Sequence, residues 1–321
     1  MLSLIKKKIH AHLPIDFGWS TRSTVLISGE GRSGTTWLSE LINHQGDYRD
    51  IFEPFWANKV PEARPFRPMM YVRPENKDLD KIKAAKKLLT GRLPKNPWTD
   101  QFEHSRNFYS RRIVKDIRTN LMLGWIRGQF PEMPIILIMR HPCAVASSWL
   151  KLNWLHNSGK QRSPQQMFED TFLSQPELIE DYLSELLPEI QSRCRSDFDF
   201  LIILWCVHNF VALKQMGNQS VHVTFYEHLV DDPVNEMRRV FHYLGRPIDN
   251  DLLKKKISSP STMSNNNSAI VQGGDPVSSW KKKVSADEIK RAKDMLKLFE
   301  LDKIYTADDR PLIKSFTQTQ V

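Results

Sequence analysis

The sequence predicts an α/β fold in which a central, mostly parallel sheet of about five strands is covered by helices on both faces. Short β-rich runs alternate along the chain with segments whose apolar residues recur three and four positions apart, as in repeated strand–helix units. The length of 321 residues suits one such domain. The apolar content of 40% can fill a large core, and 26% charged residues is ordinary for a folded protein. We therefore expect a single domain over residues 1–321.

The predicted strands follow from the β-rich runs. Four clear runs cover residues 23–28, 112–116, 135–139 and 221–225, and a weaker run covers residues 48–52. Ligands of open α/β sheets bind at the carboxyl ends of parallel strands. The residues that follow these runs are therefore the first candidates for a site.

Helical periodicity predicts the covering layers. The predicted helices cover residues 35–44, 119–130, 142–152, 233–244 and 286–301. A basic segment, 77–93, and an acidic one, 176–192, are predicted as amphipathic surface helices. Segment 201–216 is apolar nearly all round, which predicts a buried helix with Trp205 and Phe210 in the core.

Two segments are expected outside this framework. Residues 1–20 are interpreted as an N-terminal extension. Segment 258–279 is dominated by Ser, Asn, Pro and Gly, and it offers little apolar surface to pack. Long loops of this kind inside a domain often serve binding sites. We expect a mobile loop near the ligand site.

Composition narrows the class of protein. The net charge is +9, with lysine triplets at 6–8, 254–256 and 281–283, which fits either an anionic partner or a solvated basic surface. No motif that docks into nucleic acid accompanies the charge, so nucleic acid is not an expected partner. Three cysteines without a C-x-x-C pair argue against a disulfide framework or a zinc module.

The expected location is the cytoplasm. No apolar stretch approaches the ~20 residues that cross a bilayer. The N-terminus lacks an apolar region followed by a small-residue cleavage site. Peripheral contact with a membrane stays open, and the sequence predicts no oligomeric state.

The most informative segment, STVLISGEGRSGTTWLSEL, starts at residue 23. A strand runs into Gly29, Gly31 and Gly34 and then into a helix that begins with two threonines. Glycine lets backbone N–H groups converge on an anion, and a helix N-terminus adds about half a positive charge. The segment is predicted to be a phosphate loop.

The spacing of this loop is that of a Walker A motif with one change. Thr35 stands where that motif has its lysine, and the loop's cation is Arg32, three positions earlier. The strand at 135–139 ends in Arg140, where a nucleotidase often has a carboxylate for its metal. We therefore expect a compact anion to be bound without a metal.

A second anion motif is PIILIMRHPCAVASSWL, which starts at residue 134. Arg140 ends the strand, and Ser148 follows eight residues later on the next helix. Both can reach the same phosphate, the arginine through two N–H donors. Together with the first loop, they indicate a ligand with two separated phosphate groups.

These motifs resemble those of sulfotransferases that use 3′-phosphoadenylyl sulfate (PAPS). The family patterns basic-S-G-T-T-W and R-(x)₇-S stand here as 32–37 and as Arg140 with Ser148; FYEHLVDDP at 225–233 and WKK at 280–282 match less closely. The resemblance implies a P-loop-like three-layer fold and transfer of a sulfuryl group from PAPS to a hydroxyl. It also implies adenosine 3′,5′-bisphosphate as the product and no metal.

The resemblance implies residue roles as well. The 5′-phosphosulfate would contact Arg32, Ser33, Gly34, Thr35, Thr36 and Trp37. Arg140 and Ser148 would bind the 3′-phosphate, Tyr226 would lie with Trp37 near adenine, and Trp280 and Lys281 would belong to the C-terminal cofactor loop. From the residues alone, the two aromatic side chains near adenine fit core packing equally well.

The expected general base is Glu53. Small-molecule members of the family have a histidine after the strand at 112–116, but VKDIRTNLML has none. The segment DIFEPFW contains the F-E-P of the carbohydrate branch, and its aromatic neighbours are expected to raise the pKa of Glu53. The alternative is a structural carboxylate paired with an arginine.

Two cations complete the expected catalytic set. Arg32 would stabilise the bridging oxygen of the leaving group, with Lys115 or Arg118 assisting at the sulfuryl group or the acceptor. Lys115 could instead pair with Asp116 or Glu53. His156 and His208 are interpreted as structural.

The preferred hypothesis is a sulfotransferase acting on a hydroxyl of a carbohydrate or glycan-like acceptor. One alternative acceptor is a lipid or small-molecule hydroxyl. Two alternatives from other classes are a P-loop small-molecule kinase, which Thr35 disfavours, and a non-catalytic nucleotide- or polyanion-binding module.

Overall fold

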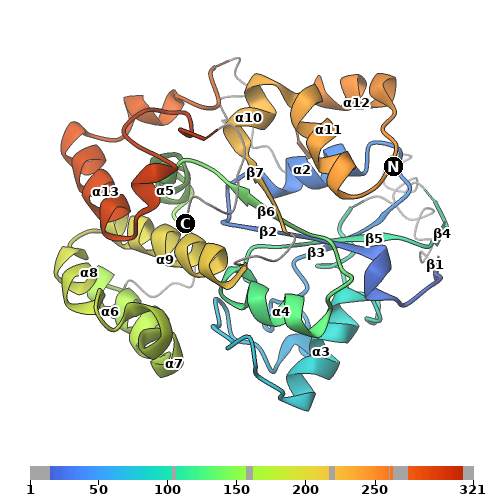
Figure 1. Cartoon of the computed structure of the whole chain (residues 1–321), viewed down its shortest axis with the longest axis horizontal. Helices are drawn as coiled ribbons and strands as arrows, with labels where there is room; N and C mark the ends of the chain where they lie inside the picture. The colour runs from blue at the N-terminus through green and yellow to red at the C-terminus, as the bar shows by residue number, and fades with distance from the viewer. Residues whose placement is uncertain are drawn as a thin grey trace, which may run out of the picture.

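The computed structural model describes residues 15–102, 106–156, 162–216, 221–259, 261–262 and 274–313. Five parallel strands form its central sheet in the order β3-β5-β2-β6-β7 (Figure 1). The strands are β2 (Thr24–Gly29), β3 (Arg49–Phe52), β5 (Arg112–Asp116), β6 (Ile135–Met139) and β7 (His222–Phe225). The predicted α/β class and the parallel five-stranded sheet are confirmed, the weaker strand included.

Helices cover both faces of this sheet because successive strand side chains point to opposite sides. Ile27 packs into one core and Leu26 into the other. The helices over the first face are α2 (Thr35–Ile42), α10 (Tyr226–Asp231), α11 (Pro233–Tyr243) and α12 (Asn250–Ile257). The second core includes α3 (Leu79–Leu89), α4 (Leu123–Gln129), α5 (Pro142–Lys151), α9 (Asp197–Met216) and α13 (Ala286–Leu298).

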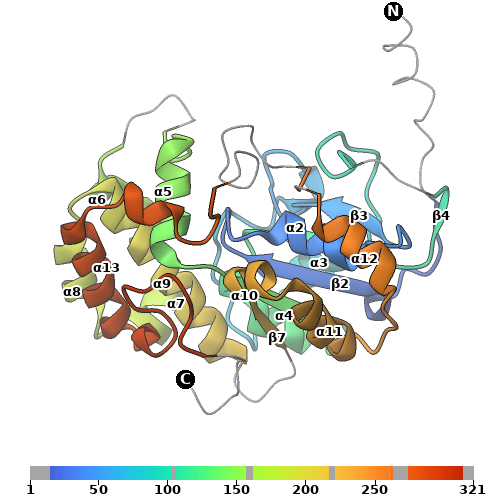
Figure 2. The ribbon, with the colours of Figure 1, turned by 90° about the horizontal axis from the view of Figure 1, so that it is seen from above.

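The helices α5, α9 and α13 form a group to one side of the sheet with α6 (Pro164–Phe168), α7 (Pro176–Leu178) and α8 (Leu187–Arg193), as Figure 2 shows from above. At its centre, α9 packs against α5 and α13. Trp205 on α9 is buried, as expected, and Phe210 is half-buried against the same core. The predicted buried helix is therefore present, and it begins four residues earlier than predicted.

Two helix predictions need correction. The single helix expected over 176–192 is wrong: the chain forms α7 (Pro176–Leu178), a π-helical turn (Ile179–Leu183) and α8 (Leu187–Arg193). Pro188 cannot donate its backbone nitrogen to a continuous helix, so it is tolerated only at a new helix start. The basic segment 77–93 contains α3, whose Leu88 and Leu89 are fully buried, so it is more than a surface helix.

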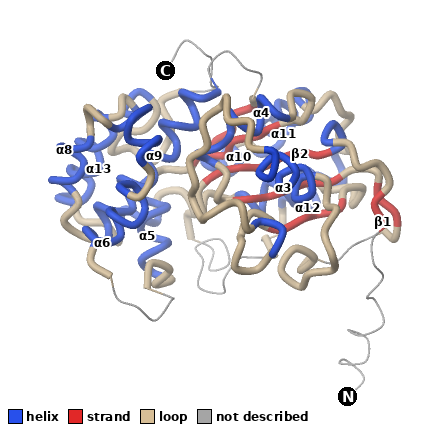
Figure 3. The backbone as a smooth tube through the Cα atoms, turned by 90° about the horizontal axis from the view of Figure 1, so that it is seen from below, coloured by secondary structure: helices blue, strands red, loops and turns tan. Residues whose placement is uncertain are grey.

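The two segments expected outside the framework are described in part. Ile15–Asp16 forms β1, which pairs with β4 (Phe108–Tyr109) as a separate parallel pair, apart from the main sheet in Figure 3. Residues 1–14 of the expected extension lie outside the described residues, as do 260 and 263–273 of the expected loop. None of the helices in the described ranges is both long and apolar enough to cross a bilayer.

Candidate active site at the strand ends

The phosphate loop, residues 29–34, lies between β2 and α2, as predicted. Gly34 has a φ of +89°, and a Cβ at this position would lie 2.5 Å from Cδ2 of Tyr226. Arg32 also has a left-handed backbone, with a φ of +75°. A non-glycine residue with positive φ carries a steric cost, which is common at functional sites.

The carbonyl groups of this loop are held by the surrounding protein. Nε1 of Trp149 donates to the Gly31 carbonyl at 2.9 Å, and Arg140 donates to the Arg32 carbonyl at 2.8 Å. The first N–H groups of a helix have no acceptor within the helix, and Thr35 and Thr36 at the start of α2 line a cleft. Two carbonyl groups of the loop thus accept hydrogen bonds from the surrounding protein, while the N-terminus of α2 lies at the cleft.

This cleft has a volume of about 220 Å³ and lies at the carboxyl edge of the sheet. Most of the predicted site residues line it: Arg32, Gly34, Thr35, Thr36, Trp37, Glu53, Lys115, Arg140, Ser148, Tyr226 and Trp280. Ser33 does not line it; its side chain is fully buried, and its hydroxyl has no partner within the described residues. Lys281 does not line it either and pairs with Asp309 at 3.5 Å.

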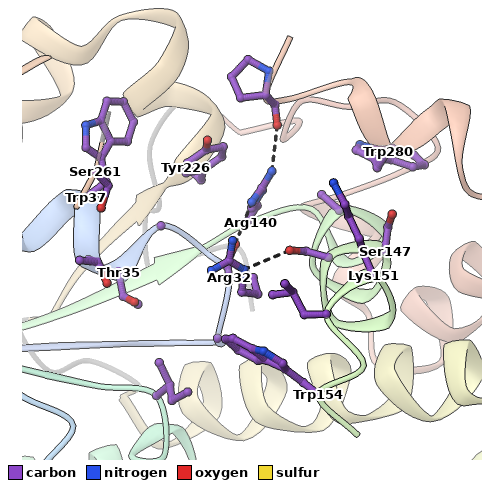
Figure 4. A pocket seen from close by; sticks show the side chains of 18 of the residues that line it. Arg32, Thr35, Trp37, Arg140, Ser147, Lys151, Trp154, Tyr226, Ser261 and Trp280 are labelled. Atoms are coloured by element: carbon purple, nitrogen blue, oxygen red, sulfur yellow. Dashed lines mark hydrogen bonds between the residues drawn. The ribbon is translucent and has the colours of Figure 1, made fainter. Parts of the chain in front are cut away.

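Arg32 and Arg140, here called the arginine pair, lie side by side in the cleft (Figure 4). Nε of Arg32 donates to the Ser148 hydroxyl at 3.1 Å. Arg140 donates to the Pro276 carbonyl at 2.8 Å and stacks 4.2 Å from the Tyr226 ring. Burial and the neighbouring Arg140 lower the pKa of Arg32. Within the described residues, neither arginine forms an ion pair with a carboxylate, so this end of the cleft is positively charged.

Glu53 lies at the other end of the cleft with Lys115 and Arg118; these three form the carboxylate cluster. Nζ of Lys115 donates to Oε1 of Glu53 at 2.5 Å, and Arg118 donates to Oε2 at 2.7 Å. Burial favours a higher pKa for Glu53, but the two cations outweigh it and the pKa is lowered. The expected raised pKa is therefore wrong, because both carboxylate oxygens are paired with cations.

The backbone explains how these three side chains meet. Phe52 of β3 lies opposite Lys115 of β5, and Glu53 continues from β3 with its N–H donating to the Lys115 carbonyl at 2.7 Å. Glu53 has a left-handed φ of +42°, and its side chain is 6% exposed. Asp116 is fully buried beside this cluster, and burial raises its pKa to about 6.

A model of the sulfotransferase domain matches residues 22–296, most of the chain. This chain belongs to the sulfotransferase family. The nodulation protein NoeE of Sinorhizobium fredii (strain NBRC 101917 / NGR234) is 29% identical over 231 residues, covering 68% of this chain and 48% of NoeE. The chain therefore spans about half the length of this curated relative.

Solved sulfotransferases are similar at a lower level. Mouse SULT7A1, complexed with PAP, is 16% identical with a TM-score of 0.44, over 89% of this chain and 85% of that one. STF9 of Mycobacterium avium is 12% identical with a TM-score of 0.46, over 95% and 81%. Membership of the sulfotransferase family is shown by the match to the domain model. This match confirms the sulfotransferase family that the sequence motifs indicated.

The cleft of this sulfotransferase also contains residues that the sequence reasoning missed. Ser147 and Lys151 lie four residues apart on α5, and Lys283 follows Trp280. The signals were present: 147 and 151 share a helix face with spacing four, and 283 ends a lysine triplet. Trp154 also lines the cleft, with Arg32 5.5 Å from its ring centre.

No cluster of three or more metal-ligating His, Cys, Asp or Glu side chains occurs within the described ranges. The polar groups that face the cleft are cationic side chains, hydroxyls and backbone N–H groups, together with the paired carboxylate of Glu53. This set matches the oxygens of sulfate and phosphate esters.

Proposed function

We propose that this sulfotransferase transfers a sulfuryl group from PAPS to a hydroxyl of a carbohydrate or glycan-like acceptor. The observation that carries the proposal is the arginine pair: two half-buried guanidinium groups share one cleft with a helix N-terminus and have no carboxylate partner within the described residues. An anionic ligand supplies the missing charge.

The phosphate loop with Arg32 is proposed to hold the phosphosulfate end of PAPS. Thr35 and Thr36, at the N-terminus of α2, line the same cleft as Arg32. Trp37 and Tyr226 meet edge to face with ring centres 6.0 Å apart, and they offer an aromatic wall for adenine. Figure 4 places both rings on one side of the arginine pair.

The second phosphate of PAPS is proposed to bind Arg140 and Ser148, as the family resemblance implies, on the α5 side of the arginine pair. Ser147, Lys151 and Trp280 lie there in Figure 4, and Lys283 lines the same cleft. Nε1 of Trp280 is buried and has no partner within the described residues, so it is suited to donate to a ligand oxygen. Lys281, expected in this role, points to Asp309 instead.

The proposed reaction forms a bond from the acceptor oxygen to sulfur and breaks the bond from sulfur to the bridging oxygen of PAPS. Glu53 accepts the proton of the acceptor hydroxyl, and Arg32 stabilises the charge on the departing phosphate. A carboxylate with a lowered pKa is a weak base, but it is ionised at neutral pH. Lys115 gives up its contact with Glu53 when the acceptor hydroxyl takes that oxygen, and it turns to the sulfuryl group.

Two half-buried tryptophans beside the carboxylate cluster favour a sugar as acceptor. Nε1 of Trp98 donates to the Glu53 carbonyl at 3.2 Å. The ring centres of Trp56 and Trp98 are 4.5 Å apart, and Cζ of Arg118 lies 4.6 Å from the ring centre of Trp56. An indole face provides apolar area with a polar edge, which suits a sugar ring. A lipid or small-molecule hydroxyl remains the second candidate, because the apolar side chains of Ile117 and Leu152 line the cleft itself, whereas Trp56 and Trp98 lie beside it.

The test is transfer of ³⁵S from labelled PAPS to a panel of sugars, lipids and phenols. We expect labelled sugar and no dependence on added magnesium. Label on lipids or phenols alone would move the acceptor class to the second candidate. Magnesium-dependent consumption of ATP without use of PAPS would favour the kinase alternative, and binding without any turnover would favour the non-catalytic module. The cytoplasmic location and the single domain stay predictions.

A further inference from the structure

The second residue of the phosphate loop has a partner far along the chain. Glu30 is 3% exposed, and its carboxylate contacts Nδ1 of His208 on α9, which is 1% exposed. Neither side chain lines the cleft, although Gly31 and Arg32 on the same loop do. Nε2 of His208 is buried without a partner within the described residues. The pair is therefore closed off from both solvent and ligand.

A buried carboxylate at this place opposes the function of the loop. An ionised Glu30 puts a negative charge within the segment that receives an anion, and like charges in a buried site repel strongly. Within the described residues, no lysine or arginine pairs with Glu30. The imidazole of His208 is thus the group able to supply a compensating proton.

The same contact fixes the position of the loop. Glu30 is attached to α9, the Gly31 carbonyl to Trp149 of α5 and the Arg32 carbonyl to Arg140. Three successive loop residues are thereby held by three different neighbours. The contact through Glu30 is the one of these three that is made by a carboxylate side chain of the loop.

We propose that Glu30 and His208 form a buried charge-compensating pair that holds the phosphate loop and keeps it receptive to anions. His208 is a positioning residue, since it acts through Glu30 and does not touch the cleft. The inference rests on the proposed function only in that the nucleotide product of PAPS serves as one of two probes.

The test is a double-mutant cycle on the full chain, read by calorimetric titration with adenosine 3′,5′-bisphosphate. His208→Asn keeps an N–H donor near the Nδ1 position but cannot carry a positive charge, and we expect about a tenfold weaker affinity. Glu30→Gln removes the carboxylate, and the double variant E30Q/H208N is expected to return to within about threefold of wild type. A purely structural role predicts a double variant that is at least as weak as H208N.

The matched control is His156→Asn. His156 pairs with Asp197 at 3.0 Å, but both side chains are partly exposed and neither lines the cleft. We expect its affinity to equal that of wild type. Wild-type affinity in H208N, or no recovery in the double variant, would overturn the pair.

Folding is checked by thermal unfolding of each variant. If H208N does not fold, the cycle is repeated with H208Q. If H208N and H208Q both unfold while the double variants that also carry E30Q fold, the unpaired buried carboxylate of Glu30 is the cause, which supports the proposal. If the double variants unfold as well, the proposal is rejected.

The second probe is inorganic pyrophosphate, which separates the two proposals. The same pattern with pyrophosphate, but no binding of the nucleotide, would reject PAPS as donor and leave the inference intact. Binding of neither probe to wild type would reject both.

Discussion

The two ends of the cleft differ in whether their charged side chains are paired. At one end, Arg32 and Arg140 lie together with no carboxylate partner within the described residues. At the other end, Glu53 is bonded through both oxygens to Lys115 and Arg118. The first end has two cations without a carboxylate partner, whereas at the second end one carboxylate is paired with two cations. This difference is the basis of the proposal that the arginine pair binds the donor and that the carboxylate cluster opens when an acceptor enters.

The largest expected effect is at the arginine pair. Arg32→Met keeps an unbranched, apolar stem but removes the guanidinium group, with its charge and its bond to Ser148. We expect turnover with PAPS to fall about 10³-fold, since a donor aimed at developing charge is lost. The control is Arg22→Met, because Arg22 is exposed and pairs with Glu132 away from the cleft. Equal losses in both variants would mean that the charge acts at a distance rather than in the site.

The next largest effect is expected at Glu53, and it tests whether the two ends of the cleft have separate roles. Glu53→Gln is expected to lower kcat about 10²-fold while the affinity for adenosine 3′,5′-bisphosphate stays within about threefold. Single-turnover kinetics and calorimetry measure the two quantities. Loss of nucleotide affinity with unchanged kcat would place Glu53 with the donor, and the contrast between the ends would disappear.

The third effect is on stability: lowering the pH is expected to reduce the contribution of the carboxylate cluster to the free energy of unfolding. The pKa of Glu53 is lowered in the folded state, so its stabilisation is present above its unfolded pKa of about 4.3 and is lost as pH falls through the folded value. E53Q is expected to unfold about 2 kcal/mol more easily than wild type at pH 7, because it leaves two cations unpaired. Urea unfolding should show this difference shrinking at pH 3. A difference that does not change with pH would mean that Glu53 is not ionised in the native state.

The smallest effect concerns the second phosphate. Lys151→Ala removes one cation at the rim of the cleft, where solvent screens charge, so we expect about fivefold weaker nucleotide affinity. Adenosine 5′-phosphate, which lacks the second phosphate, should bind both proteins alike. An equal loss for both nucleotides would assign Lys151 to the phosphate loop's ligand instead.

The sequence predicted the parts of this structure that depend on local pattern. Strands β5 and β6 have the bounds expected from their β-rich runs, and the glycine loop between β2 and α2 follows from residue types alone. The pairing of Glu53 with Lys115 was one of the alternatives, but the added bond from Arg118 fixes the direction of the pKa shift. That bond depends on the register of β3 on β5, which no local pattern contains.

Other features depend on contacts between distant segments. Glu30 and His208 are 178 residues apart, so a lone histidine on an apolar helix gave no sign of its partner. The side chain of Lys281 turns to Asp309, although its neighbour Trp280 faces the cleft. In both cases, tertiary packing decides which of several charged residues meets the site.

The most direct test of the account is calorimetric titration of adenosine 3′,5′-bisphosphate into wild type and Arg140→Ala. We expect binding to wild type and at least tenfold weaker affinity in the variant, because a half-buried charge-assisted contact is removed. Equal affinities, or no binding to wild type, would contradict the claim that the arginine pair receives the donor's phosphates.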